Sequence, residues 1–83
     1  MNKILVEVYI PAANKSYDVF LPTKYRIYEV LQLLLVNMKD LVGGYFEPSE
    51  DTVICNGETG KVLDINKSVE EHSLTNGSKL III

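Results

Sequence analysis

Residues 26–42 read RIYEVLQLLLVNMKDLV, the only stretch of this 83-residue chain that is long and periodic enough to form a substantial helix. Its apolar residues recur at steps of three, four and seven, so they line one face of an α-helix with 3.6 residues per turn. They are Ile27, Val30, Leu31, Leu34, Met38 and Leu41. Because one helix cannot bury such a stripe alone, the stripe predicts a helix that lies on a sheet.

The segment before the helix predicts an antiparallel hairpin of two strands. Residues 3–10 are rich in isoleucine and valine, and residues 16–21 follow after a short connection in which Asn14 suits a turn. With the side-chain period of two, one set of residues faces the core: Ile4, Val6, Val8, Ile10, Tyr17, Val19 and Leu21. The other set faces outward: Leu5, Glu7, Tyr9, Asp18 and Phe20.

The segment after the helix predicts short strands around a longer final one. Gly43 and Gly44 are expected to end the helix in a left-handed cap. We expect a third strand at residues 51–55, with Cys55 facing the core and Ile54 facing outward, and a brief fourth strand at residues 61–63.

The last part of the chain predicts one helical turn and then the central strand. Residues 69–72 are expected to form a single helical turn with Ser68 as its cap. Residues 78–83 contain an unbroken apolar run, as expected for a strand in the middle of a sheet, parallel to the first strand. The fold class predicted for residues 1–83, as one domain, is α+β: a β-grasp with a mixed four- to five-stranded sheet packed on one long helix, and one short helical turn.

Composition and charge exclude several classes of function. The chain is 47% hydrophobic and 23% charged, as in a folded soluble protein, and its net charge of −3 argues against nucleic acid as a partner. The single cysteine, Cys55, indicates a reducing, cytoplasmic location. Glu7 interrupts the apolar N-terminal run, which argues against a signal peptide, and no segment reaches the roughly 20 apolar residues of a membrane span, so membrane contact is expected to be indirect.

Two segments together resemble ubiquitin. KSYDVFLPTKYRIYEVLQLLL, residues 15–35, is similar to ubiquitin's second strand and helix in the spacing of its apolar positions, and KSVEEHSLTNGSKLIII, residues 67–83, is similar to its closing pattern. The resemblance implies the ubiquitin-like β-grasp fold. Ubiquitin and the sulfur-carrier proteins act through a flexible tail that ends in Gly-Gly, whereas this sequence ends at Ile83 in the last strand, so we expect neither conjugation nor sulfur transfer.

Among tailless relatives, the length, the acidic balance and the ending VEEHSLTNGSKLIII look most like the YukD-type ubiquitin-like proteins of bacterial type VII secretion systems. That resemblance implies a small, non-enzymatic, cytoplasmic accessory protein that contacts the secretion machinery or its cargo. The alternative is a ubiquitin-like modifier or sulfur carrier whose functional tail is missing from this chain.

No catalytic residue, metal site, cofactor or small-molecule substrate is predicted. His72 has no second histidine near it and reads as a solvated side chain on a surface turn. Cys55 would need an adjacent base to act as a nucleophile, and its position in a strand indicates packing instead.

The candidate functional site is therefore a surface that binds a protein partner or a second copy of the chain. The predicted outward residues of neighbouring strands form a patch on the face that corresponds to ubiquitin's apolar recognition patch. These residues are Leu5, Phe20, Ile54, Ile81 and Ile83. The opposite possibility is that loops or side-chain stems cover them, and the helix offers an alternative contact face at Leu33 and Val36, away from its core stripe.

Overall fold

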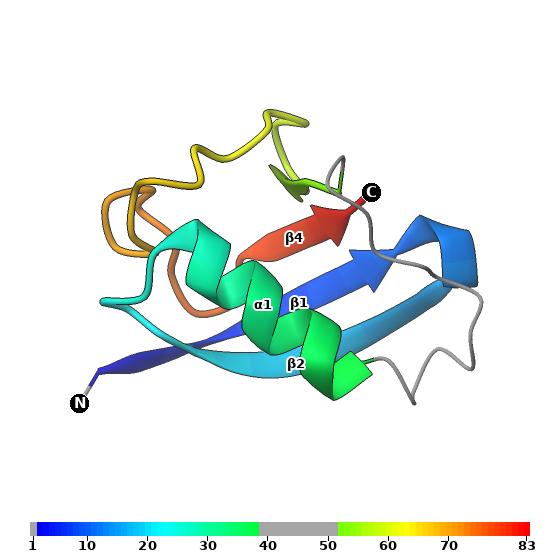
Figure 1. The fold of residues 1–83 in the computed structure, drawn as a ribbon, viewed down its shortest axis with the longest axis horizontal. Coiled ribbons are helices and arrows are strands. Elements are labelled where there is room, and N and C mark those ends of the chain that lie inside the picture. Colours follow the sequence, from blue (N-terminus) through cyan, green and yellow to red (C-terminus); the bar gives the residue numbers. More distant parts are fainter. Residues whose placement is uncertain (1, 39–51) are drawn as a thin grey trace.

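One helix lies across one face of a four-stranded sheet in the computed structural model, which describes residues 2–38 and 52–83 (Figure 1). The strand order is β2-β1-β4-β3. In chain order the elements are β1 (Lys3–Ile10), the 3₁₀-helix η1 (Pro11–Ala13), β2 (Lys15–Pro22), α1 (Ile27–Met38), β3 (Ile54–Asn56) and β4 (Lys79–Ile82). The predicted β-grasp arrangement of a hairpin, a crossing helix and a central last strand is confirmed.

The hairpin pairs β1 with β2 along their whole length, from Lys3 opposite Pro22 to Ile10 opposite Lys15. The strands are joined by η1, where the sequence predicted only a short connection, and by Asn14 at φ 51°. Asparagine is one of the few residues that adopt this left-handed conformation readily, because its short polar side chain can bond locally.

The last strand, β4, is the centre of the sheet as predicted. It runs parallel to β1, with Leu80 opposite Val8, and antiparallel to β3, with Ile82 opposite Ile54. Leu80 and Ile82 are almost completely buried beneath α1, whereas Ile81 is partly exposed and Ile83 is exposed, so the apolar run supplies both faces of the strand. One residue further, the backbones of Ile83 and Val53 exchange two hydrogen bonds of 3.0 and 3.1 Å.

The core stripe of α1 is confirmed where the structure describes it. Ile27, Val30 and Leu34 are buried, and Leu31 packs against the same core cluster. The predicted end of the helix at residues 39–42, with Leu41, and the Gly43–Gly44 cap lie outside the described residues, and the Met38 side chain is not described.

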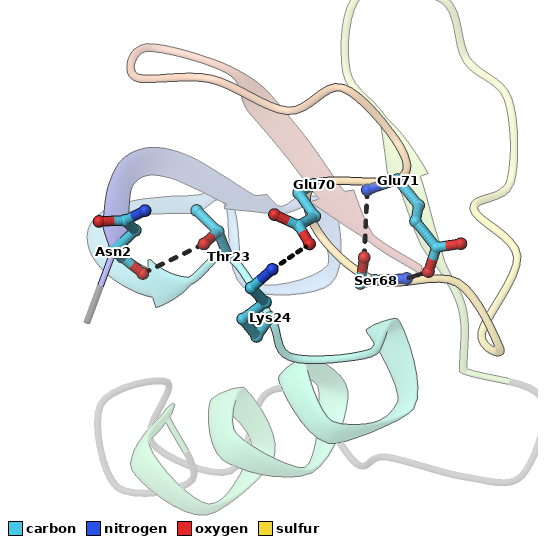
Figure 2. Close-up of polar contacts among 6 residues, drawn as sticks. All are labelled: Asn2, Thr23, Lys24, Ser68, Glu70 and Glu71. Carbon is cyan, nitrogen blue, oxygen red and sulfur yellow. Dashed lines mark hydrogen bonds and ion pairs between the residues drawn. The ribbon is translucent and has the colours of Figure 1, made fainter.

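The start of α1 is held by contacts from two distant parts of the chain (Figure 2). The Thr23 hydroxyl donates to the backbone carbonyl of Asn2 at 3.3 Å, and the Glu70 N–H donates to the Thr23 carbonyl at 3.0 Å. Lys24 Nζ lies 2.8 Å from Glu70 Oε1, in an exposed ion pair of the kind that adds little stability by itself. At the first residue of the helix itself, the Ile27 N–H donates to the Lys67 carbonyl at 2.9 Å, so backbone bonds anchor the start of α1.

The predicted helical turn at residues 69–72 is a capped turn without a continuing helix. The Ser68 N–H donates to Glu71 Oε1 at 3.0 Å, and the Glu71 N–H donates to Ser68 Oγ at 3.1 Å, which together form a reciprocal capping box (Figure 2). The His72 N–H bonds the Ser68 carbonyl with helical spacing, at 3.1 Å. Ser73 then takes φ 57°, which ends the turn.

The sheet is shorter than predicted on the β3 side. The predicted fourth strand, residues 61–63, makes a single bridge between Val62 and Cys55. Asp64 stops the pairing because its carboxylate accepts the Asn66 N–H at 2.9 Å and bends the chain away. Of the predicted third strand at residues 51–55, the structure assigns Ile54–Asn56 to β3, and residue 51 lies outside the described residues.

Removing the capping hydroxyl should lower stability. We expect Ser68→Ala to reduce the free energy of unfolding by about 1 kcal/mol, as for other lost helix caps. Ser16→Ala, which removes an exposed strand hydroxyl, is the control and should change little. Urea unfolding followed by circular dichroism measures both, and equal stability of the two variants would contradict a stabilising role for the capping box.

The same capping box predicts a pH dependence. The Ser68 N–H, and then the Ser68 hydroxyl, lower the pKa of Glu71 below its ordinary value of 4.5. A carboxyl whose pKa is lower in the folded state stabilises above its unfolded pKa, and that stability is lost as pH falls through the folded pKa. The urea midpoint of the wild type should therefore fall in acid more steeply than that of Glu71→Gln.

Gly57 allows β3 to approach β4. Its N–H donates to the Lys79 carbonyl at 2.7 Å, and a Cβ added to Gly57 would lie 2.9 Å from Lys79 Cβ and 3.0 Å from Lys79 O. Gly60 differs because its φ is +77° and a Cβ there would meet no atom within 4 Å. The first glycine is required for space and the second for its backbone conformation.

We expect asparagine to separate these two requirements, because it tolerates left-handed backbone but not a steric clash. Gly57→Asn should lower the free energy of unfolding by about 1–3 kcal/mol, as for other overpacked sites. Gly60→Asn should cost much less. Thermal unfolding of the two variants measures the difference, and equal losses would show that the β3–β4 contact relaxes without penalty.

Candidate interaction surface

The face of the sheet that points away from α1 carries most of the predicted contact residues. Leu5 and Phe20 are direct cross-strand partners, so their side chains share this outer face at one end of the β1–β2 pair. Leu5 is 37% exposed and Phe20 is 64% exposed. The structure therefore places Leu5 and Phe20 together on the surface, as the sequence predicted.

Ile81 and Ile83 lie further along the same outer face. Ile81 is opposite Tyr9 on β1 and opposite Cys55 on β3, so it is at the middle of the sheet, and it is partly exposed. Ile83 is 61% exposed and is held by its backbone bonds to Val53. The two isoleucines alternate with the buried Leu80 and Ile82, as the sequence predicted.

A row of charged residues separates these two pairs. Glu7 is opposite Asp18 on β2 and opposite Lys79 on β4, and all three are exposed. From Leu5 to Tyr9 the strand advances four residues, or about 13 Å at the usual rise per residue. The predicted patch is therefore two apolar clusters with a charged row between them, not one continuous surface.

Ile54 is not a surface residue, and the prediction that it faces outward is wrong. It is opposite Ile82, on the side of the sheet covered by α1, and is only 1% exposed. Cys55 is buried as predicted, but it is opposite Ile81, so it belongs to the outer face and not to the core beneath the helix. The register with β4, which alternates from core to outer face at each residue, decides both positions.

Val62 and Tyr9 extend the row of apolar side chains on the outer face of the sheet. The sequence did not predict either of them as a contact residue. Val62 bridges to Cys55, so its side chain shares the outer face, and it is 61% exposed. Tyr9 continues the row on the other side of Ile81. We refer to Tyr9, Ile81, Cys55, Val62 and Ile83 as the outer-face patch. A correct phase for Cys55 would have identified Val62, because Asn56-Gly57 and Thr59-Gly60 between them are turn dipeptides that close a hairpin.

The outer-face patch borders a hollow with charged residues on one side. The hollow has a volume of about 180 Å³ and is bounded by Tyr9 and Ile81, with Glu7 and Lys79 on its charged side. A hollow of this size suits one apolar side chain of a partner, with opposite charges nearby to orient it.

The alternative contact face on α1 is less continuous. Val36 is 78% exposed, but Leu33 is only partly exposed. Among the helix residues whose side chains the structure describes, the next exposed large apolar one is Tyr28, eight residues earlier and about 12 Å away along the axis, with the exposed Gln32 between them. These residues make isolated apolar positions, which are common on protein surfaces.

The candidate chemical groups have local packing partners. His72 Nε2 lies 3.0 Å from the Asp64 backbone carbonyl, and the Cys55 side chain is buried. Within residues 2–38 and 52–83, no three His, Cys, Asp or Glu side chains are grouped so that they could hold a metal ion. Within the same two ranges, no helix has the length and apolar character needed to span a bilayer.

Comparison with known proteins identifies the fold. No protein-family model and no curated protein matches the chain. The ubiquitin of Caldiarchaeum subterraneum superposes with a TM-score of 0.77 at 12% identity, covering 99% of this chain and 92% of that chain. The EccD5 ubiquitin-like domain from Mycobacterium xenopi gives a TM-score of 0.74 at 17% identity, covering 100% of this chain and 94% of that chain.

A domain of a type VII secretion system protein is also similar. The ubiquitin-like domain of the Mycobacterium tuberculosis type VII secretion system protein EccD1 gives a TM-score of 0.67 at 15% identity, covering 100% of this chain and 99% of that chain. These likenesses confirm the ubiquitin-like β-grasp fold, with a mixed four-stranded sheet and one helix. At such low sequence identities, these structural likenesses are evidence for the fold and not for a shared function.

The corrected position of Ile54 changes what a substitution there should do. We expect Ile54→Asp to unfold the protein, because it would bury an unpaired charge beneath α1. Ile54→Ala should lower the free energy of unfolding by about 2–5 kcal/mol, as for other large-to-small core substitutions. Phe20→Ala is the surface control. Urea titration of Ile54→Ala and Phe20→Ala measures the contrast, and equal midpoints would place Ile54 outside the core.

Proposed function

We propose that this protein is a non-enzymatic, ubiquitin-like interaction module that binds a protein partner through its outer-face patch. The observation that carries the proposal is the placement of Ile81, Ile83 and Val62 on the face opposite α1, where they form a cluster around the buried Cys55. Clustered exposed apolar residues on a small domain mark an interaction site more often than scattered ones do.

The layout of the patch suits a protein partner. Ile81 is at the centre and is partly shielded, Ile83 and Val62 lie around it, and Glu7 and Lys79 form a charged border. Interfaces commonly have an apolar centre and a polar rim, and the central residues contribute most of the binding energy. Ile81 is therefore the residue whose loss should weaken binding most.

We place the module in a type VII secretion system, as a cytoplasmic accessory component. Two features support this assignment: the structural likeness to the two EccD ubiquitin-like domains and the resemblance of residues 67–83 to the ending of YukD-type proteins. The partner is then a component or a cargo of the secretion machinery. The net charge of −3 favours such a partner over nucleic acid.

The local environments of the two candidate reactive residues favour binding over catalysis. The Cys55 side chain is buried between β4 and the bridging Val62, which restricts access to a substrate. The contact of His72 Nε2 with the Asp64 carbonyl leaves that nitrogen poorly placed to act as a base. No cofactor is part of the proposed function.

We expect Ile81→Asp to lower affinity for the native partner by at least about 30-fold, since it places a charge at the centre of an apolar contact. Affinity purification from the native host with quantitative mass spectrometry identifies the partner, and titration with the purified partner gives the affinity. Circular dichroism of the variant checks that it is folded.

Two matched aspartate variants locate the interface. Phe20→Asp tests the other apolar cluster of the outer face, and Val36→Asp tests the helix face. Both should bind as the wild type does. Full binding by a folded Ile81→Asp variant would remove the outer-face patch from consideration, and loss of binding in Val36→Asp alone would move the interface to α1. The intact mass of the native protein tests the carrier alternative, which predicts an adduct on a C-terminal tail.

A further inference from the structure

In the part of the chain that the structure describes, residues 61–63 form the edge of the sheet on the side of β3 away from β4. The Asn56 N–H donates to the Lys61 carbonyl at 2.8 Å, and the Leu63 N–H donates to the Ile54 carbonyl at 2.9 Å. In Figure 1 the chain leaves β3 on this side before it crosses towards the start of α1. Residues 61–63 therefore pair with the free side of β3, and their own other side becomes the edge of the sheet.

The backbone of Val62 points away from the sheet at this edge. Its two neighbours turn their bonding groups towards β3, and successive residues of an extended chain alternate, so the N–H and C=O of Val62 face outward. Neither group makes a hydrogen bond to any other residue in the described parts of the chain. An edge with a free donor and a free acceptor is a template for another strand.

The same residue joins this edge to the outer-face patch. Val62 bridges to Cys55, which is opposite Ile81, so one row of side chains runs from the free edge to the centre of the sheet. A strand added at Val62 would place alternate side chains on the outer face beside this row. The edge and the patch are therefore parts of one continuous surface.

A second hollow lies along this edge. Its volume is about 330 Å³, and Thr59, Lys61, Val62, Asp64 and His72 are among the residues that line it. Such a volume is at the lower end of the range for ligand pockets in proteins, and it accommodates one large side chain from a peptide that follows the edge.

We propose that the partner docks by adding an extended peptide segment to the edge at Val62, with alternate apolar side chains on the outer face next to the patch. The segment contains no proline at the paired position, because the pairing needs its N–H. This mode of binding rests on the proposed function, since it uses the same patch. The backbone pair at Val62 supplies the register, and the apolar row supplies the contact area.

The test uses a short capped peptide in which valine alternates with threonine and glutamate, titrated to about 1 mM into the isotopically labelled full chain and followed by NMR. We expect the Val62 amide signal to shift and its hydrogen exchange to slow. The same peptide with an N-methyl group on its central valine should bind about three- to tenfold more weakly, because it loses one backbone hydrogen bond.

Two variants at one position separate the backbone from the side chain. Val62→Pro removes the N–H and should weaken binding of the peptide to the same extent. Val62→Thr keeps the N–H and the branched shape, and should weaken binding less than Val62→Pro does, because it loses only apolar contact in the outer-face patch. The N-methylated peptide gives the same test on the wild-type protein, so an unfolded Val62→Pro variant leaves the proposal testable.

Three outcomes would overturn the proposal. The first is that no amide signal shifts at the highest peptide concentration. The second is that the signals of Tyr9 and Ile81 shift but the N-methylated peptide binds as tightly as the unmodified one. The third is that the Val62 amide is already protected without peptide, through self-association of the chain. The second outcome leaves the outer-face patch intact as an interface. Conversely, full partner binding by Ile81→Asp would contradict the proposed function whatever happens at Val62, so the two failures are distinguishable.

Discussion

The burial of one face of α1 against the two central strands is the constraint on which this fold depends. Ile27, Val30 and Leu34 pack in the same cluster as Val8 and Leu80. Fully burying an aliphatic side chain contributes about 1.5–3 kcal/mol, and a domain this small has few such residues to lose. The contacts around the start of the helix then determine where it lies on the sheet, because they connect it to both the N-terminus and the capped turn near the C-terminus.

Covering one face of the sheet leaves the other face for contact with partners. β4 lies between β1 and β3, so its outward residue Ile81 is at the centre of the exposed face. The parallel pairing of β4 with β1 brings Tyr9 beside Ile81, and it also brings Lys79 beside Glu7. The same register that builds the core therefore divides the outer face into an apolar centre and a charged border.

The β3 side of the sheet combines close packing with an incomplete edge. Gly57 lets its backbone approach Lys79, and the chain then returns to pair with β3 for one bridge before Asp64 bends it away. If residues 61–63 formed a longer strand, the pairing with β3 would continue past one bridge. The single bridge leaves the Val62 side chain exposed and its backbone bonding groups without a partner among residues 2–38 and 52–83, and this links the local turn chemistry to the proposed way of binding.

Periodicity in the sequence was sufficient for α1, the β1–β2 hairpin and the central last strand, because each of these segments is long enough to show which residues face the core. It was not sufficient for β3. Val53, Ile54 and Cys55 are all apolar, so a strand this short has no alternation to set its phase. Only the pairing of Ile54 with Ile82 determines that Ile54 is in the core and that Cys55 and Val62 share the outer face. Residue order thus determined which elements form, whereas the register between distant strands decided which side chains meet on the surface, because cross-strand neighbours are set by hydrogen bonding over long sequence separations.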